Sequence, residues 1–169
     1  MYDVKNFNLL RLARRIEREA AVDLTQRRAW HVDLTLTTTA IKWVSGAQPI
    51  YGLIASVALT AGQVVYQDTA DTLIKAARAN AVATVTNVLG IVLAAAQAGG
   101  QTIIAPNSAR INIGATCTAG TNYCISAGAA GAIAPWADLG TGNYVYNLFI
   151  GEGTNNVNLN FNLGPVVHA

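Results

Sequence analysis

Two histidines, two cysteines and nine carboxylates are the main candidates in this chain for bases, nucleophiles or metal ligands. His31 falls on the polar side of a predicted strand and His168 is one residue from the end, and neither fits a Ser/His/Asp or metal-ligand pattern. The phrases GEGTNN and LGTGNY have the glycines of a phosphate-binding loop but not its Lys-Ser/Thr. With nine carboxylates in 169 residues, no acid–base pair stands out. We therefore expect no enzymatic activity, no cofactor and no metal site.

The two cysteines, Cys117 and Cys124, flank the phrase TAGTNY. A tight turn at Gly120-Thr121 would place them opposite each other across a hairpin, where a cross-strand disulfide could form. A reducing cytoplasm, which we infer below, disfavours disulfides. We therefore expect two small buried thiols rather than a disulfide.

Four arginines recur at three- and four-residue spacings in NFNLLRLARRIEREAA, residues 6–21. The apolar residues of this segment follow a helical period, which predicts an amphipathic helix. The arginines are Arg11, Arg14, Arg15 and Arg18, and the apolar residues are Leu9, Leu12, Ala13, Ile16 and Ala20. Such a helix could be solvated, could dock on a partner protein or could contact nucleic acid. Nucleic acid is the least favoured partner, because Glu17, Glu19 and Asp23 dilute the positive charge and no aromatic residue lies among the arginines.

Charge is unevenly distributed along the chain. Charged residues make up 12% of the sequence, about half of the usual quarter, and the net charge is +2. Seven Lys and Arg residues precede residue 30, none follows Arg110, and the last fifty-nine residues carry only Asp138 and Glu152. This asymmetry predicts two parts with different roles: a charged N-terminal segment and a nearly neutral body that hides surface in an assembly.

The apolar stretches of the chain are short or interrupted. The most apolar run, residues 82–98, contains Thr84, Asn87 and Gln97, so we expect no membrane-spanning segment. The first twenty residues scatter charges among apolar residues and lack the continuous apolar core of a signal peptide. We therefore expect a protein that is made and used without secretion, in a reducing cytoplasm.

Beyond Asp23 the pattern changes to that of short strands. Trp30, Val32, Leu34 and Leu36 alternate with polar residues, which predicts a strand with one buried face. From Gln48 onward, short apolar segments are separated by turns that contain glycine. Strands are predicted within residues 50–59, 63–68, 83–96, 101–105, 110–117, 121–127, 131–139, 143–151 and 156–167, and a turn or single helical turn is predicted at 71–80. The fold class is therefore mainly β: a compact barrel- or sandwich-like body of short strands, with an N-terminal α-helix and an extended arm.

Three tryptophans could contribute to binding. Trp30, Trp43 and Trp136 could stack on carbohydrate, but tryptophans at strand positions more often anchor a core or a protein interface. We favour the role of core or interface anchors.

Several phrases from about Leu59 onward occur in a characteristic order and cover about two-thirds of the chain. They are TAGQVVYQDTADTLIKAARANA, VLGIVLAAAQAGGQTIIA, INIGATCTAGTNYCISAGAAGAIAPWADLGTGNYV and LFIGEGTNNVNLNF. This body resembles a β-rich domain of capsid cement, or head decoration, proteins of tailed bacteriophages. Similar modules also occur in phage fibres. The resemblance implies a non-enzymatic virion protein that acts as a homotrimer on the outer capsid surface, bridges neighbouring capsomers and binds the major capsid protein.

Two domains follow from these patterns: residues 1–50, a helix and arm that attach to the capsid, and residues 51–169, a β-rich trimerisation and decoration domain. The residues expected to bind the capsid are Arg11, Arg14, Arg15, Arg18, Leu9, Leu12, Ile16 and Trp30. A fibre or adhesin module that binds host glycan is the alternative, and it would require exposed Trp or Tyr beside Asn and Asp. A nucleic-acid-binding accessory protein is the third possibility.

Overall fold

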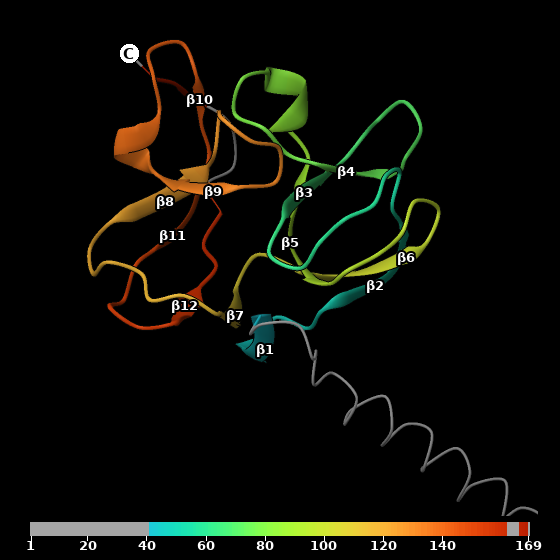
Figure 1. Ribbon diagram of the computed structural model, residues 1–169, viewed down its shortest axis with the longest axis horizontal. Helices are drawn as coiled ribbons and strands as arrows, with labels where there is room; N and C mark the ends of the chain where they lie inside the picture. Colours follow the sequence, from blue (N-terminus) through green and yellow to red (C-terminus); the bar gives the residue numbers. More distant parts are fainter. Residues whose placement is uncertain (1–40, 162–165, 169) are drawn as a thin grey trace, which may run out of the picture. The chain divides into compact units, whose positions relative to one another are not determined.

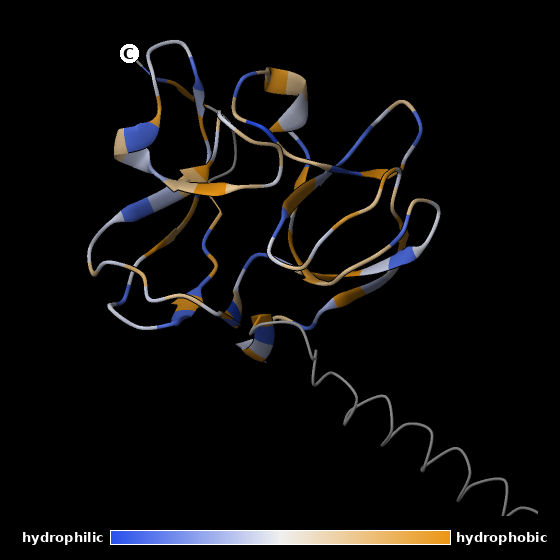
Figure 2. Ribbon diagram, viewed as in Figure 1, coloured by the Kyte–Doolittle hydropathy of each residue, from blue (hydrophilic) through white to orange (hydrophobic). Residues whose placement is uncertain are grey.

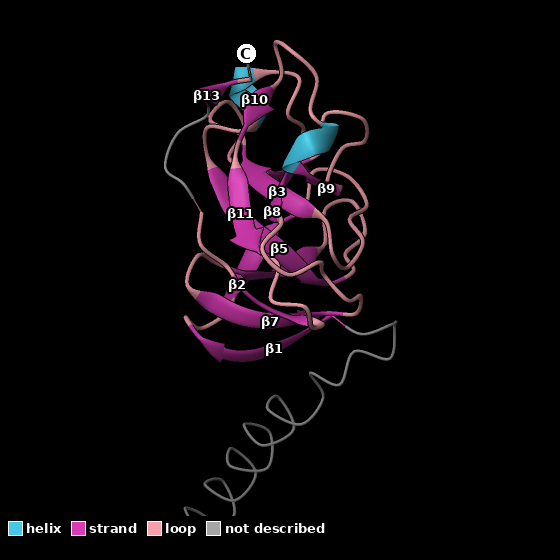
Figure 3. Ribbon diagram, turned by 90° about the vertical axis from the view of Figure 1, so that its left-hand side faces the viewer, coloured by secondary structure: helices cyan, strands magenta, loops and turns pink. Residues whose placement is uncertain are grey.

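The computed structural model of the protein describes residues 41–161 and 166–168. The predicted helix at 6–21, the strand around Trp30 and the capsid-binding residues of the N-terminal segment lie outside these residues. The described part is mainly β, as predicted, with two single-turn 3-10 helices, η1 (Val82–Thr84) and η2 (Trp136–Asp138) (Figure 3). None of its helices is long and apolar enough to cross a membrane.

The strands form four antiparallel sheets (Figure 1). A five-stranded sheet has the order β2-β6-β5-β3-β4, and two three-stranded sheets have the orders β1-β7-β12 and β11-β8-β9. The fourth sheet is the ribbon β10-β13. The strand bounds are β1 Ile41–Gly46, β2 Ile50–Ile54, β3 Val64–Gln67, β4 Ile74–Ala76, β5 Val88–Ala94, β6 Gln101–Ala105, β7 Ala109–Ile113, β8 Asn122–Ile125, β9 Ile133–Pro135, β10 Tyr144–Val145, β11 Asn147–Ile150, β12 Asn156–Asn158 and β13 Val166–Val167.

The centre of the five-stranded sheet is buried on both faces. Val65 and Val92 point into a small core on one face, whereas Val64 and Ile91 point into the main core on the other. Because both faces are covered, β3 and β5 are mostly apolar, and their valine, leucine and isoleucine positions are orange in Figure 2. Gly90 permits close pairing of β5 with β6, because a Cβ atom at this position would overlap the carbonyl oxygen of Ala105.

The same sheet curls strongly without closing. Ala55, just after β2, forms a single parallel bridge with Ile74 at the start of β4, and the Ser56 N–H donates to the Ile74 carbonyl at 2.9 Å. A closed barrel would need a continuous ladder of hydrogen bonds between the two edge strands, and a single bridge does not supply one. The β body is therefore a set of antiparallel sheets, and the predicted barrel does not form. The main core joins this curled sheet to the two three-stranded sheets through Phe149, Ile111 and their neighbours.

The C-terminal alternation is confirmed as far as the structure describes it. Val157, Leu159 and Phe161 are buried, whereas Asn158 and Asn160 are exposed. Each buried side chain joins the main core, so this segment closes the side of the body formed by β7 and β12.

One local prediction is wrong. Residues 71–80, expected to form a turn or helical turn, contain strand β4, and the helical turn lies further on at η1. The Asp68 and Asp71 carboxylates accept from the N–H groups of Ala70 and Leu73, at 2.9 and 3.0 Å, and thereby fix the turn before β4. Pairing with β3 then overrides the helical preference of the alanine-rich sequence.

The β3–β4 turn predicts a dependence of stability on pH. The Lys75 ammonium lies 2.7 Å from a carboxylate oxygen of Asp68 and of Asp71, and these hydrogen bonds lower the pKa of both carboxyl groups and raise the pKa of Lys75. Because folding lowers the pKa of the two carboxyl groups, their ionised forms stabilise the folded protein above pH 3.8, the ordinary pKa of aspartate. This stabilisation is lost as the pH falls through the lowered pKa values of the folded protein. Because folding raises the pKa of Lys75, its ammonium group stabilises the folded protein below pH 10.5, the ordinary pKa of lysine. This stabilisation is lost as the pH rises through the raised pKa of Lys75 in the folded protein.

Replacing Lys75 with Met should therefore lower the free energy of unfolding most at neutral pH. The gap from the wild-type protein should close as the carboxylates are protonated below pH 3.8. Denaturant unfolding of both proteins at a series of pH values measures this gap, and a gap that stays constant with pH would contradict the assignment.

Candidate interaction surfaces

Few charges are available on the described body. It contains four basic and four acidic residues, so its net formal charge is zero with His168 neutral. Lys75 pairs with two aspartates, Arg110 pairs with Glu152 at 3.0 Å, and Arg78 donates to the carbonyls of Ala127 and Gly128. Among the eight charged residues of the described body, only Lys42 and Asp138 make none of these contacts. Most of the charge on this body is therefore engaged in contacts within the body.

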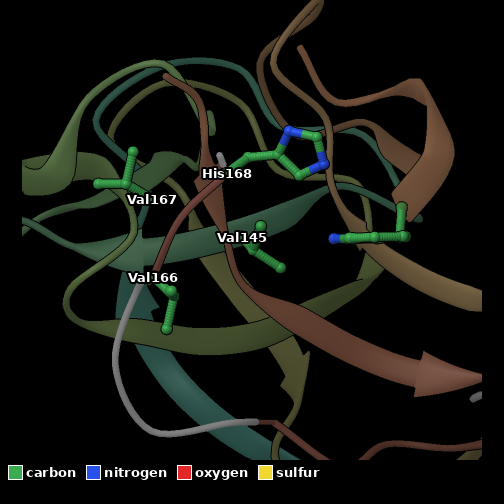
Figure 4. Close-up of a pocket in the computed structure, with 5 residues that line it drawn as sticks. Val145, Val166, Val167 and His168 are labelled. Carbon is green, nitrogen blue, oxygen red and sulfur yellow. The ribbon is translucent and has the colours of Figure 1, made fainter. Parts of the chain in front are cut away.

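The first candidate surface is an open cleft of about 530 Å³ beside the C-terminal ribbon. Its lining is Trp136, Val145, Val166, Val167 and His168, which we call the C-terminal cleft. Val145 lies on β10 and the last two valines on β13, so pairing of these short strands brings the valines together (Figure 4). The His168 N–H donates to the Asn143 carbonyl at 2.7 Å, and the Gly142 N–H donates to the His168 carbonyl at 2.9 Å.

Aromatic rings form one wall of the C-terminal cleft. Trp136 begins η2 directly after β9 and is 47% exposed. Its indole meets the His168 imidazole edge-on, with ring centroids 5.2 Å apart. His168 Nδ1 is buried and has no hydrogen-bond partner among the described residues. With three valines and an indole, the cleft suits apolar side chains rather than a charged group.

The second candidate surface lies near β2, an edge strand of the five-stranded sheet. Tyr51, Ile54 and Val57 are large apolar side chains that remain exposed, and we call them the edge patch. Tyr51 and Ile54 come from β2, and Val57 follows three residues later. Residues 43–67 contain no Lys, Arg, Asp or Glu, so the edge strand lacks the charges that usually prevent association.

Among the described residues, no group of three or more His, Cys, Asp or Glu could hold a metal ion. Cys117 and Cys124 are free buried thiols. They are not paired across a hairpin, because Cys124 on β8 lies opposite Asn147 and Ala134, while the Cys117 N–H donates to the Thr154 carbonyl.

The buried thiols should react slowly in the folded protein. Burial raises the pKa of the Cys124 thiol to about 11 and also raises that of Cys117, so little thiolate forms at neutral pH. Treatment of the native protein with a chromogenic disulfide reagent at pH 7.5 should label neither cysteine within minutes, and denaturant should release both. Rapid labelling of the native protein would contradict their burial.

The tryptophans differ in their environments. Trp43 is half-buried against the main core, and its Nε1–H donates to the Ala47 carbonyl at 3.0 Å, which fits an anchoring role. Trp136 is exposed in the C-terminal cleft, and Trp30 lies outside the described residues. Sequence reasoning identified Trp136 but missed the valines beside it and the edge patch. The uncharged run 43–67 was the available signal for the edge patch.

Comparison of the chain with models of known protein families gives no match, and comparison with curated proteins gives none either. A function therefore has to be inferred from the surfaces of the body and from the ordered phrases of the sequence.

Proposed function

We propose that this protein is a structural virion protein of the capsid cement type. It binds the outer surface of a tailed-phage capsid as a homotrimer and bridges neighbouring capsomers. The observation that carries the proposal is the surface of the described body, where charges are few, balanced and mostly used internally, while several large apolar side chains remain exposed, among them those of the C-terminal cleft and the edge patch. Such a surface suits burial in an assembly. The resemblance of the body to phage decoration proteins supplies the virion context.

A cement protein of this kind stabilises the shell by mass action. Whatever binds the assembled shell but not its separated parts shifts the equilibrium toward the shell. A trimer presents three attachment segments at once, so weak individual contacts combine into a strong overall attachment. This role requires binding alone and no covalent step.

The N-terminal segment, residues 1–50, is the proposed attachment to the major capsid protein. Seven of the eleven Lys and Arg residues precede residue 30, and outer shells of tailed phages are commonly acidic, as the family implies. Arginine pairs with carboxylates through two parallel hydrogen bonds. Because exposed ion pairs contribute only about 0–1 kcal/mol each, the apolar residues Leu9, Leu12, Ile16 and Trp30 supply the larger part of the attachment.

Reconstitution on stripped capsids tests this function. Purified protein added to capsids that lack it should bind to saturation at a fixed copy number and raise the temperature at which the shells release their DNA. Capsids incubated with a heat-denatured sample are the control. Absence of binding at micromolar concentration, or saturation with no change in shell stability, would overturn the proposal.

A host-glycan-binding module remains the second candidate, because one of its requirements is met. Trp136 is exposed, and Asp138, two residues later in η2, is also exposed. An indole can stack on the apolar face of a sugar while a carboxylate accepts from its hydroxyls. Under this alternative, Trp136→Ala would abolish binding of the protein to host cells, whereas cement function predicts no specific binding to host cells by the wild-type protein.

A further inference from the structure

We draw no further inference here: the strongest candidate, the C-terminal cleft beside β10 and β13, is an open depression with an apolar lining, and nothing in the structure shows what covers it.

Discussion

Deletion of residues 1–22 is expected to abolish binding to stripped capsids while leaving a folded oligomer. The deletion removes five of the seven basic residues that precede residue 30, among them Arg11, Arg14, Arg15 and Arg18. It also removes Leu9, Leu12 and Ile16, the apolar residues proposed to contact the shell. The β body begins at Ile41, so its cores and both apolar surfaces remain. Binding assays by co-sedimentation and oligomer size by native mass spectrometry measure the two effects independently.

Two substituted full-length chains separate charge from apolar contact. Lysine at all four arginine positions keeps the charge but loses bidentate pairing, and it should weaken capsid binding without abolishing it. Serine at Leu9, Leu12 and Ile16 should abolish binding, because exposed ion pairs alone are too weak. If the truncated protein still decorates capsids at wild-type occupancy, the β body is the attachment surface and the role assigned to residues 1–50 is wrong.

The second large effect is expected from Phe149→Ala, which should lower the free energy of unfolding by about 3–5 kcal/mol. Phe149 on β11 is 2% exposed and stacks on Tyr123 of β8, its cross-strand partner, with ring centroids 5.0 Å apart. Removal of the ring would leave a cavity in the main core and would end the aromatic pairing of the two strands. Denaturant unfolding followed by tryptophan fluorescence measures the loss.

The neighbouring residue supplies a matched control. Ile150 is the next residue on the same strand and is 59% exposed, so Ile150→Ala should change stability by less than about 0.5 kcal/mol. Losses of similar size in the two variants would show that the strand does not bury the face described above.

The sequence was informative where local signals decide the structure. Strand β6 occupies the predicted residues 101–105, and β3 lies within 63–68, because apolar runs bounded by glycine turns mark buried strands. Alternation at Val157, Leu159 and Phe161 predicted the buried face of the C-terminal segment for the same reason. Strand β4 was missed, because its alanine-rich sequence becomes a strand only through pairing with β3.

The candidate surfaces depend on contacts that sequence patterns do not show. The C-terminal cleft forms because Val145 pairs with Val166 across twenty residues of chain, and Trp136 reaches it from a third segment. Similarly, the hairpin that could have placed Cys117 opposite Cys124 does not form, because β8 takes β11 and β9 as its neighbours. Long-range pairing of this kind determines which side chains share a surface.

A reconstruction of purified virions by electron cryomicroscopy tests the central claim most directly. The proposed function predicts trimeric density that fits the β body on the outer capsid surface, at threefold or local threefold positions, with the N-terminal segment in contact with the major capsid protein. Density for this chain only in fibres or tail structures, or its absence from the virion, would contradict the claim.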